Sequence, residues 1–303
     1  MEKGRERESI AIVGAGALGT LLAMSLPRSG ARVRVLVRDE RRAAALAREA
    51  PDAEPTTDPS ALFPAALLFL CVKSHQTANA AADLARALRQ DAPATPFVSL
   101  QNGWGNLEAL ERLLPPTPLV AGATTLGAYR DDAGALRTST GGGTVFAAWT
   151  PDAALAADAA VRLFAAAGLR AVGAPDGREV LWRKLVLNVA VNPVTALHAL
   201  PNGALLDTPA LHELAAGLAR EAVAVGAARG HLSAPYDPLP SLNALLRDTA
   251  ANRSSMAEDV ARGRPTEADA ILGAVIREGK AACVATPLAA SVAARLSGAE
   301  SRR

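Results

Sequence analysis

Two different patterns of hydrophobic and polar positions divide the chain. In its first half, short apolar runs such as residues 9–13 and 32–37 alternate with segments of helical spacing. Strands that are apolar along their whole length are typical of a parallel sheet covered by helices on both faces. Beyond Asp176 helical spacing continues alone to the end of the chain. The pattern predicts an α/β domain over residues 1–175, followed by an all-α domain over residues 176–303.

The end of the predicted α/β domain has its own strand pattern. After Pro118 the regular alternation gives way to short extended pieces, which we interpret as antiparallel strands that close the domain. A helix and a last strand complete the prediction. The extended pieces cover residues 119–130, 134–139 and 141–149, the helix covers 153–167, and the last strand covers 169–175.

The first strand runs directly into a glycine-rich turn, GAGALG, and an apolar helix follows. In a dinucleotide-binding turn, Gly14 would allow the tight bend, Gly16 would let the backbone approach a pyrophosphate, and Gly19 would let helix pack on strand. The helix begins with Ala17 and Leu18, whose amides and dipole would face the phosphates. This strand–turn–helix–strand context predicts a Rossmann-type dinucleotide-binding domain. The alternative is a structural glycine loop in another kind of α/β protein.

The residue after the second strand distinguishes the two nicotinamide dinucleotides. NAD sites place a carboxylate there for the ribose 2′-hydroxyl, whereas NADP sites place a cation near the 2′-phosphate. Here the residue is Arg38, although Asp39 follows it immediately. A second cation, Lys73, ends the predicted strand LLFLCVK at the carboxyl edge of the same sheet. The two cations favour NADP, with solvated surface charges as the alternative.

A polar turn, QNGWG, follows the next predicted strand. It lies at another carboxyl end of the sheet, so Asn102 is placed where cofactor and substrate would meet. The alternative is an ordinary Asn-Gly turn.

The first helix of the second domain carries a polar seam. Lys184, Asn188 and Asn192 recur at steps of four among valines and leucines, so their side chains share one helix face. Asparagine is a poor helix former and is costly to bury unpaired, which favours a ligand or a polar partner segment on this face. We expect Pro193 to bend or end the helix just after Asn192. We also expect the seam to line a cleft between the two domains, where cofactor and substrate meet.

Further polar residues follow in the second domain. Asn202 lies in the turn PNG, and Glu267 follows Pro265 and Thr266 at a helix start. Several of these residues have an ordinary structural alternative. The Glu267 carboxylate could interact favourably with the dipole at the helix start, a serine could cap a helix, and Asp259 could pair with a neighbouring arginine. The other candidates in this region are Ser254, Ser255 and Asp259, with Arg262 and Arg264 as partners for Asp259.

Composition narrows the class of protein. Half of the 303 residues are hydrophobic and the net charge is only +2, which does not favour a nucleic-acid partner. The charged N-terminus lacks a signal-peptide core and no apolar run reaches the length of a membrane span, so we expect a cytoplasmic protein. Cys71 and Cys283 stand alone, without the spacing of a metal site or a disulfide framework. The Ala-rich helix faces fit either a core or a homodimer interface.

Taken together, these segments resemble the ketopantoate reductase (2-dehydropantoate 2-reductase) family. The resemblance runs nearly from end to end, in the family's order and spacing. Its segments are GAGALG, VKSHQT, QNGWGN, RKLVLNVAVNPVTAL, PNG and SSMAEDVARGRPTEADAILG. It implies NADPH-dependent reduction of 2-dehydropantoate to pantoate, in the synthesis of pantothenate and coenzyme A.

The resemblance also implies roles for individual residues. Lys184 matches the catalytic acid, and Glu267 matches the residue that orients substrate and lysine. Arg38 and Lys73 would bind the 2′-phosphate, and Asn102 would lie beside the cofactor. The residues implied to bind substrate are Asn188, Asn202 and Ser255. Asn192 and Asp259 match recurrent polar positions of the family without an assigned role, and we group Asn192 with the substrate-binding residues.

The hypothesis that follows is a hydride transfer from NADPH to the keto carbon of a 2-oxo acid. Lys184, as an ammonium, would donate a hydrogen bond and then a proton to the carbonyl oxygen. Partial burial would disfavour the charged form of Lys184, and the nearby carboxylate of Glu267 would favour it again. Three alternatives stay open: a paralogue that reduces another 2-oxo acid, a non-catalytic NADPH sensor, and a hydroxyacid or polyol-phosphate dehydrogenase that uses Arg178 and Arg183.

Overall fold

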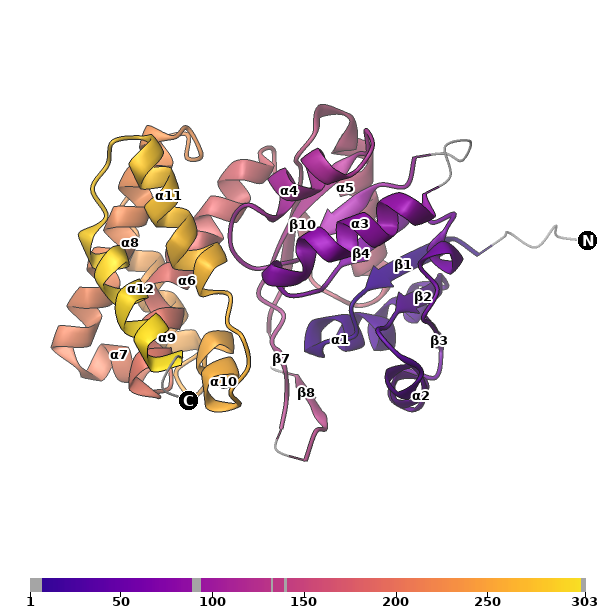
Figure 1. Ribbon diagram of the computed structural model, residues 1–303, viewed down its shortest axis with the longest axis horizontal. Helices are drawn as coiled ribbons and strands as arrows, with labels where there is room; N and C mark the ends of the chain where they lie inside the picture. Colours follow the sequence, from indigo (N-terminus) through magenta and orange to yellow (C-terminus); the bar gives the residue numbers. More distant parts are fainter. Residues whose placement is uncertain (1–6, 89–93, 132, 139–140, 301–303) are drawn as a thin grey trace, which may run out of the picture. The chain divides into compact units, whose positions relative to one another are not determined.

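The computed structural model describes residues 7–88, 94–131, 133–138 and 141–300 (Figure 1). The first six residues of the charged N-terminal stretch lie outside the described residues, as does Ser139 at the end of one predicted strand. The chain forms two compact units. Unit 1 contains the residues up to Gln101 together with Asn106–Val180, and unit 2 contains Asn102–Gly105 together with the residues from Leu181 onward.

Unit 1 is built on an eight-stranded sheet in the order β10-β9-β6-β5-β4-β1-β2-β3. Neighbouring strands are parallel except at one place, where β6 and β9 pair antiparallel. The strands are β1 (Ser9–Val13), β2 (Arg32–Leu36), β3 (Ala53–Thr56), β4 (Leu67–Leu70), β5 (Phe97–Ser99), β6 (Leu119–Thr124), β9 (Thr144–Ala148) and β10 (Ala171–Gly173). A separate antiparallel hairpin pairs β7 (Ala128–Arg130) with β8 (Leu136–Thr138).

Helices connect these strands and cover the sheet (Figure 1). Phe69 of β4, Phe146 of β9 and Phe164 of α5 are fully buried, and Phe164 lies against both other rings, with centroids 5.6 and 4.8 Å away. The sheet core is therefore continuous from its centre to its antiparallel end. The helices of unit 1 are α1 (Ala17–Ser25), α2 (Glu40–Glu49), α3 (Thr77–Ala87), α4 (Asn106–Leu113) and α5 (Ala154–Ala166).

In its described residues, unit 2 consists of helices joined by turns and loops, without a strand. Its helices are α6 (Gly177–His198), whose first turn belongs to unit 1, α7 (Ala204–Asp207), α8 (Pro209–Ala228), α9 (Leu239–Asp248), α10 (Ser255–Ala261), α11 (Ala274–Ala281) and α12 (Pro287–Glu300). A π-helical turn, Asp269–Gly273, precedes α11. The prediction of a Rossmann-type α/β domain followed by an all-α domain is confirmed.

The antiparallel strands predicted after Pro118 are found in the structure, where the first predicted piece divides into β6 and β7. The antiparallel pairs are β6 with β9 and β7 with β8, whereas β10 pairs parallel with β9. The helix predicted over residues 153–167 is α5. The first half of the sheet could be read from its apolar runs, but the pairing of three-residue edge strands depends on long-range contacts that no local pattern specifies.

The division into units differs from the predicted boundary after residue 175. It falls after Val180, because the first turn of α6 packs on unit 1. A Cβ on Gly177 would lie 2.7 Å from the carbonyl oxygen of Ala148, and the Arg178 guanidinium lies 4.2 Å from the centre of the Trp149 ring. The tetrapeptide Asn102–Gly105 belongs to unit 2, although the sequence places it between two elements of unit 1.

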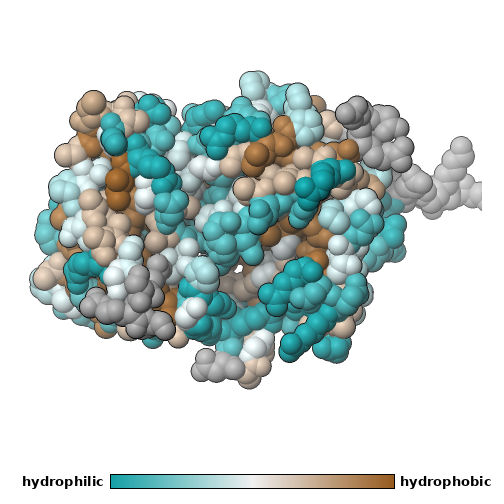
Figure 2. Space-filling view, in the orientation of Figure 1, coloured by the Kyte–Doolittle hydropathy of each residue, from teal (hydrophilic) through white to brown (hydrophobic). Residues whose placement is uncertain are grey.

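Hydrophilic and hydrophobic residues are interspersed on the face shown in Figure 2, and hydrophilic side chains cover the visible side of α2. No helix in the described part of the chain combines the length and the apolar character that a membrane span requires.

Candidate functional site

The glycine-rich turn after β1 is fixed by close backbone contacts. Gly14 has a left-handed φ of +98°, and a Cβ there would lie 2.8 Å from Cγ1 of Val72. A Cβ on Gly19 would lie 1.9 Å from the carbonyl oxygen of Gly14, so the first turn of α1 can approach the turn only with glycine at this position. Around Gly16, by contrast, a Cβ would meet nothing within 4 Å. The turn is therefore tight on its inner side and open at Gly16.

The sheet topology places this turn where nucleotides bind in doubly wound folds. β1 has β2 on one side and β4 on the other, so the strand order reverses at β1. In doubly wound folds, loops diverge at such a switch point, and nucleotides bind there, at the carboxyl ends of the strands. Ala17 and Leu18 begin α1 there, and no side chain caps the helix. The amides of this helix start are therefore available to an anion.

Lys73 lies on the loop after β4, but β4 is shorter than predicted. The strand ends at Leu70 rather than at Lys73, because the chain turns where Val72 meets Gly14. Lys73 is half-buried and precedes a short 3₁₀ turn, Ser74–Gln76. Burial raises the pKa of the Cys71 thiol to about 12, so Cys71 stays a neutral core side chain beside the turn.

The structure separates the roles of Arg38 and Asp39. Asp39 is the N-cap of α2, and its Oδ1 accepts a hydrogen bond of 2.7 Å from the amide of Arg42. This bond is the largest cause of the lowered pKa of Asp39, and a hydrogen bond from Arg38 adds to it. The Arg38 side chain is 86% exposed. The carboxylate is thus engaged in capping and in a pair with Arg38, and the cation is the more exposed of the two groups that follow β2.

The polar seam lies on α6 as a continuous helical face. Lys184 and Asn188 are half-buried, and Asn192 is 8% exposed. Neither carboxamide hydrogen-bonds to any described residue. We expected Pro193 to bend or end the helix, and an end there is wrong: α6 continues to His198, and Ala199 has a positive φ of 54°. Fully buried neighbours hold the helix together across the proline, which removes only one backbone donor.

Lys184 and Glu267 interact electrostatically within unit 2. Burial lowers the pKa of Lys184 to about 8, and the charge of Glu267 acts in the opposite direction. Glu267 is itself buried, with 5% exposure, and its Oε2 accepts a hydrogen bond of 3.2 Å from Nδ2 of Asn102. Glu267 therefore interacts with two side chains, Lys184 and Asn102, in addition to any interaction with the helix dipole.

Asn102 reaches Glu267 because its tetrapeptide docks on the π-helical turn Asp269–Gly273. The amide of Trp104 donates to the carbonyl oxygen of Ala270 at 2.8 Å, and Gly103, with φ of +85°, brings its backbone against the same residue. A Cβ on Gly103 would lie 2.5 Å from that oxygen. π-Helical turns are frequent at functional sites. The glycine of the predicted Asn-Gly turn therefore permits a contact between segments distant in sequence.

An aromatic cluster that the sequence did not predict fixes the same tetrapeptide. The rings of Trp104, Trp182 and His231 lie with centroids 4.3 to 4.9 Å apart, and Trp182 donates to the carbonyl oxygen of Ala222 at 2.8 Å. His231 also lies 3.0 Å from Oε2 of Glu278. The available signal was the tryptophan next to the Asn-Gly turn, one of only three in the chain.

The remaining predicted residues of unit 2 fall into buried and exposed groups. Asn202 is 7% exposed, and Nδ2 donates to Thr249 while Oδ1 has no described partner. Ser254 caps α10 by accepting from the amide of Ala257, whereas Ser255 is exposed at the first position of the helix. The capping role thus belongs to Ser254, and the Ser255 hydroxyl faces solvent.

Asp259 pairs with Arg264, as the structural alternative predicted, with 2.9 Å between Oδ1 and Nη2. The pair is not a surface pair, because Asp259 is 3% exposed. A buried carboxylate requires such a partner. Asp259 therefore ties α10 to the segment that leads to Glu267.

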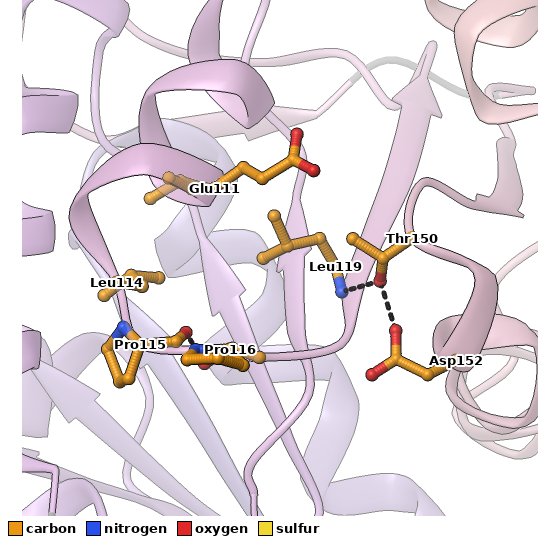
Figure 3. Close-up of a pocket in the computed structure, with 9 residues that line it drawn as sticks. Glu111, Leu114, Pro115, Pro116, Leu119, Thr150 and Asp152 are labelled. Carbon is orange, nitrogen blue, oxygen red and sulfur yellow. Dashed lines mark hydrogen bonds between the residues drawn. The ribbon is translucent and has the colours of Figure 1, made fainter.

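A cavity of about 340 Å³ lies elsewhere on unit 1, between the end of α4, the start of β6 and the turn before α5 (Figure 3). The Thr150 hydroxyl accepts from the amide of Leu119 and donates to Asp152. The lining contains two carboxylates, Glu111 and Asp152, and no cationic side chain. It has no charge complementary to an organic acid, and none of the predicted site residues lines it.

Comparison with known proteins identifies the family. Residues 10–151 match the family described as "Ketopantoate reductase PanE/ApbA", and residues 176–300 match its C-terminal domain. The chain belongs to the ketopantoate reductase family. It is accordingly an oxidoreductase that acts on a CH–OH group.

Relatives of this ketopantoate reductase family member cover most of its length. A 2-dehydropantoate 2-reductase of Vibrio cholerae is 32% identical over 92% of this chain and 94% of its own. One of Halobacterium salinarum is 33% identical over 78% of this chain and 77% of its own. A solved ketopantoate reductase of Ralstonia eutropha has a TM-score of 0.84 at 28% identity and covers 97% of this chain and 99% of its own. The fold also occurs in a D-mandelate dehydrogenase solved with NADH, with a TM-score of 0.87 at 22% identity, covering 97% of this chain and 99% of its own.

Proposed function

We propose that the chain is an NADPH-dependent reductase that converts 2-dehydropantoate to pantoate, a step in the synthesis of pantothenate and coenzyme A. The observation that carries this proposal is the group formed by Lys184, Glu267 and Asn102 in unit 2. A lysine with its pKa near neutral beside a buried carboxylate is suited to proton donation at neutral pH. The relatives named 2-dehydropantoate 2-reductase support the choice of substrate.

The residues of unit 1 fit a nicotinamide dinucleotide. The open space at Gly16 and the uncapped start of α1 suit a pyrophosphate, which bears negative charge. Arg38 is exposed at the end of β2, where an NADP 2′-phosphate would need a cation, and Lys73 lies on the loop after β4. When bound, NADPH supplies the hydride. The unit 1 residues proposed to hold it are Gly14, Gly16, Ala17, Leu18, Gly19, Arg38 and Lys73. Asn102, which belongs to unit 2, is proposed as a further contact of the cofactor.

Lys184 supplies the proton. As an ammonium it donates a hydrogen bond to the keto oxygen of the substrate and transfers the proton as that oxygen becomes an alkoxide. Its pKa of about 8 leaves most of it charged at pH 7 and makes it a stronger acid than an ordinary lysine. Glu267 keeps it protonated, and Asn102 holds Glu267 by its hydrogen bond.

The carboxamides of unit 2 provide hydrogen bonds for a polar substrate. Asn188 and Asn192 have no hydrogen-bond partner among the described residues, and Oδ1 of Asn202 has none either. Buried polar atoms are usually paired, so their unused capacity favours a ligand with hydroxyl and carboxylate groups. The residues proposed to bind substrate are Asn188, Asn192, Asn202 and Ser255.

The arginines considered for a phosphorylated substrate are engaged elsewhere. The guanidinium of Arg178 lies over the Trp149 ring, and that of Arg183 lies 4.4 Å from the centre of the Tyr236 ring. Cation–π contacts of this kind orient an arginine along the aromatic face. They favour a 2-oxo acid over a polyol phosphate.

The test is the initial rate of NADPH oxidation with 2-dehydropantoate, with pyruvate and 2-oxoisovalerate beside it and NADH as the control cofactor. We expect turnover that is selective for NADPH and for 2-dehydropantoate. Turnover of another oxo acid alone would make the chain a paralogous reductase. NADPH binding with all three oxo acids inert would favour a sensor, and the proposal of catalysis would be withdrawn.

A further inference from the structure

A second group of charged residues lies directly behind the glycine-rich turn of unit 1. Arg42 of α2 donates from Nε and Nη2 to the carbonyl oxygen of Ala15, at 3.1 and 2.8 Å. Its Nη2 also lies 2.7 Å from the Thr20 hydroxyl oxygen, and that hydroxyl donates to the carbonyl oxygen of Gly16 at 2.7 Å. One guanidinium thus contacts both the middle of the turn and the first helix.

Glu49 and Arg130 hold Arg42 in this position. Nη1 and Nη2 of Arg42 each lie 3.1 Å from Oε2 of Glu49. From β7, Arg130 donates to both oxygens of Glu49, at 2.9 and 3.0 Å. The hydrogen bonds from Arg130 and Arg42 lower the pKa of Glu49 against the effect of burial. The Arg42 side chain is only 19% exposed, so its guanidinium is a fixed part of unit 1 rather than a mobile surface cation.

Fixing the carbonyl of Ala15 also fixes the amide of Gly16. The two groups belong to one planar trans peptide, in which the C=O and the N–H point in opposite directions. With the oxygen turned toward Arg42, the N–H of Gly16 points away from it. That amide has no hydrogen-bond partner in the described part of the chain, and the space outside Gly16 is open. Amides aligned in this way form anion-binding sites.

We propose that Arg42, held by Glu49 and Arg130, is a positioning residue that aims the Gly16 amide at the cofactor pyrophosphate. This inference rests on the proposed function only as far as the cofactor is a dinucleotide. Arg42 acts through the peptide and does not itself contact the cofactor, because its donors are engaged by Ala15, Thr20 and Glu49. NADPH and NADH share the pyrophosphate, so both should depend on Arg42 equally.

The experiment measures Kd for NADPH and for NADH by fluorescence titration of the full chain. Arg42→Gln should raise both constants by the same factor, about 10- to 100-fold, the range that a hydrogen bond to a charged group supplies. Arg48→Gln removes the same charge from an exposed position of the same helix and should change either constant less than about twofold. Arg42→Lys keeps the charge without the planar fork and should give an intermediate loss. At saturating NADPH, kcat of Arg42→Gln should stay within about twofold of wild type, because the positioned amide binds the cofactor away from the reacting atoms.

Three outcomes with the variants overturn the inference. A loss confined to NADPH would mean that Arg42 contacts the 2′-phosphate directly. Unchanged constants in Arg42→Gln and Arg42→Lys would mean that the turn needs no support. An equal loss of affinity in Arg48→Gln would mean that the weaker binding of Arg42→Gln reflects only the change in net charge. If Arg42→Gln does not fold, Arg42→Lys decides by the same criteria. If wild type binds neither dinucleotide, the proposed function fails and the inference fails with it, whereas failure at Arg42 alone leaves the proposed function standing.

Discussion

Replacing Glu267 by glutamine isolates the electrostatic part of the lysine–carboxylate pair. The variant keeps the size of the side chain and an oxygen that can accept from Asn102, but it removes the charge. Burial lowers the pKa of Lys184 to about 8 while Glu267 opposes this effect. An opposite charge at close range typically changes a pKa by about 1–3. We therefore expect the pKa of Lys184 in Glu267→Gln to fall to about 7 or lower.

This shift translates into a pH-dependent loss of rate. With a pKa of about 8, Lys184 is roughly half ammonium at pH 8 and almost fully ammonium at pH 6. With a pKa of about 7, only about a tenth is ammonium at pH 8, while about nine-tenths remains at pH 6. Because only the ammonium donates the proton, activity is lost as pH rises through the pKa. The loss of kcat in Glu267→Gln at pH 8 should exceed the loss at pH 6 by about fivefold or more.

The assay is kcat for NADPH oxidation at saturating substrate, from about pH 5.5 to about pH 9.5. Asp269→Asn is the matched control, because this carboxylate lies two residues further along the chain but is exposed and pairs with Arg277. Its pH profile should be that of wild type. If kcat of Glu267→Gln falls by one factor across the whole range, with its midpoint where wild type has it, the electrostatic reasoning is refuted.

Three further variants test other parts of the structure. Lys184→Ala should lower kcat roughly 100-fold or more while the Kd for NADPH, measured by fluorescence, stays near wild type. Gly19→Ala places a Cβ 1.9 Å from a backbone oxygen and should abolish NADPH binding or folding, whereas Gly173→Ala, whose Cβ would meet nothing within 4 Å, should leave the melting temperature and the Kd unchanged. Trp104→Leu should cost about 2 kcal/mol in chemical denaturation and lower kcat, because Asn102 loses its support; wild-type stability with lowered kcat would contradict the packing argument.

The elements that contain their own signal could be predicted from the sequence. The buried strands, the glycine-rich turn with its following helix, and the polar seam of α6 depend on local periodicity and on glycine geometry. In the structure the apolar strand residues are buried, and Gly14 has the positive φ that a tight turn requires. Of the bend or end expected at Pro193, the end is wrong, because tertiary packing outweighs the loss of one backbone hydrogen bond.

The parts that could not be predicted depend on contacts between distant segments. Nothing local in QNGWG indicates that Asn102 meets Glu267 or that Trp104 packs against Trp182 and His231. The network of Arg42, Glu49 and Arg130 could not be predicted from the sequence either. Taken singly, each of these residues has the pattern of a charged side chain exposed to solvent. Such pairs become visible only when the sheet order and the helix faces are known.

The π-helical turn Asp269–Gly273 makes the site sensitive to chain length as well as to residue identity. A π-turn accommodates one residue more than an α-turn. Deleting a single residue there would restore a regular helix and rotate everything before it by about 100° relative to α11. Glu267 lies just before this turn, so the deletion would carry its carboxylate away from Asn102 without changing any residue of the site. In family members, the number of residues between the glutamate and α11 should therefore be as strictly maintained as the glutamate.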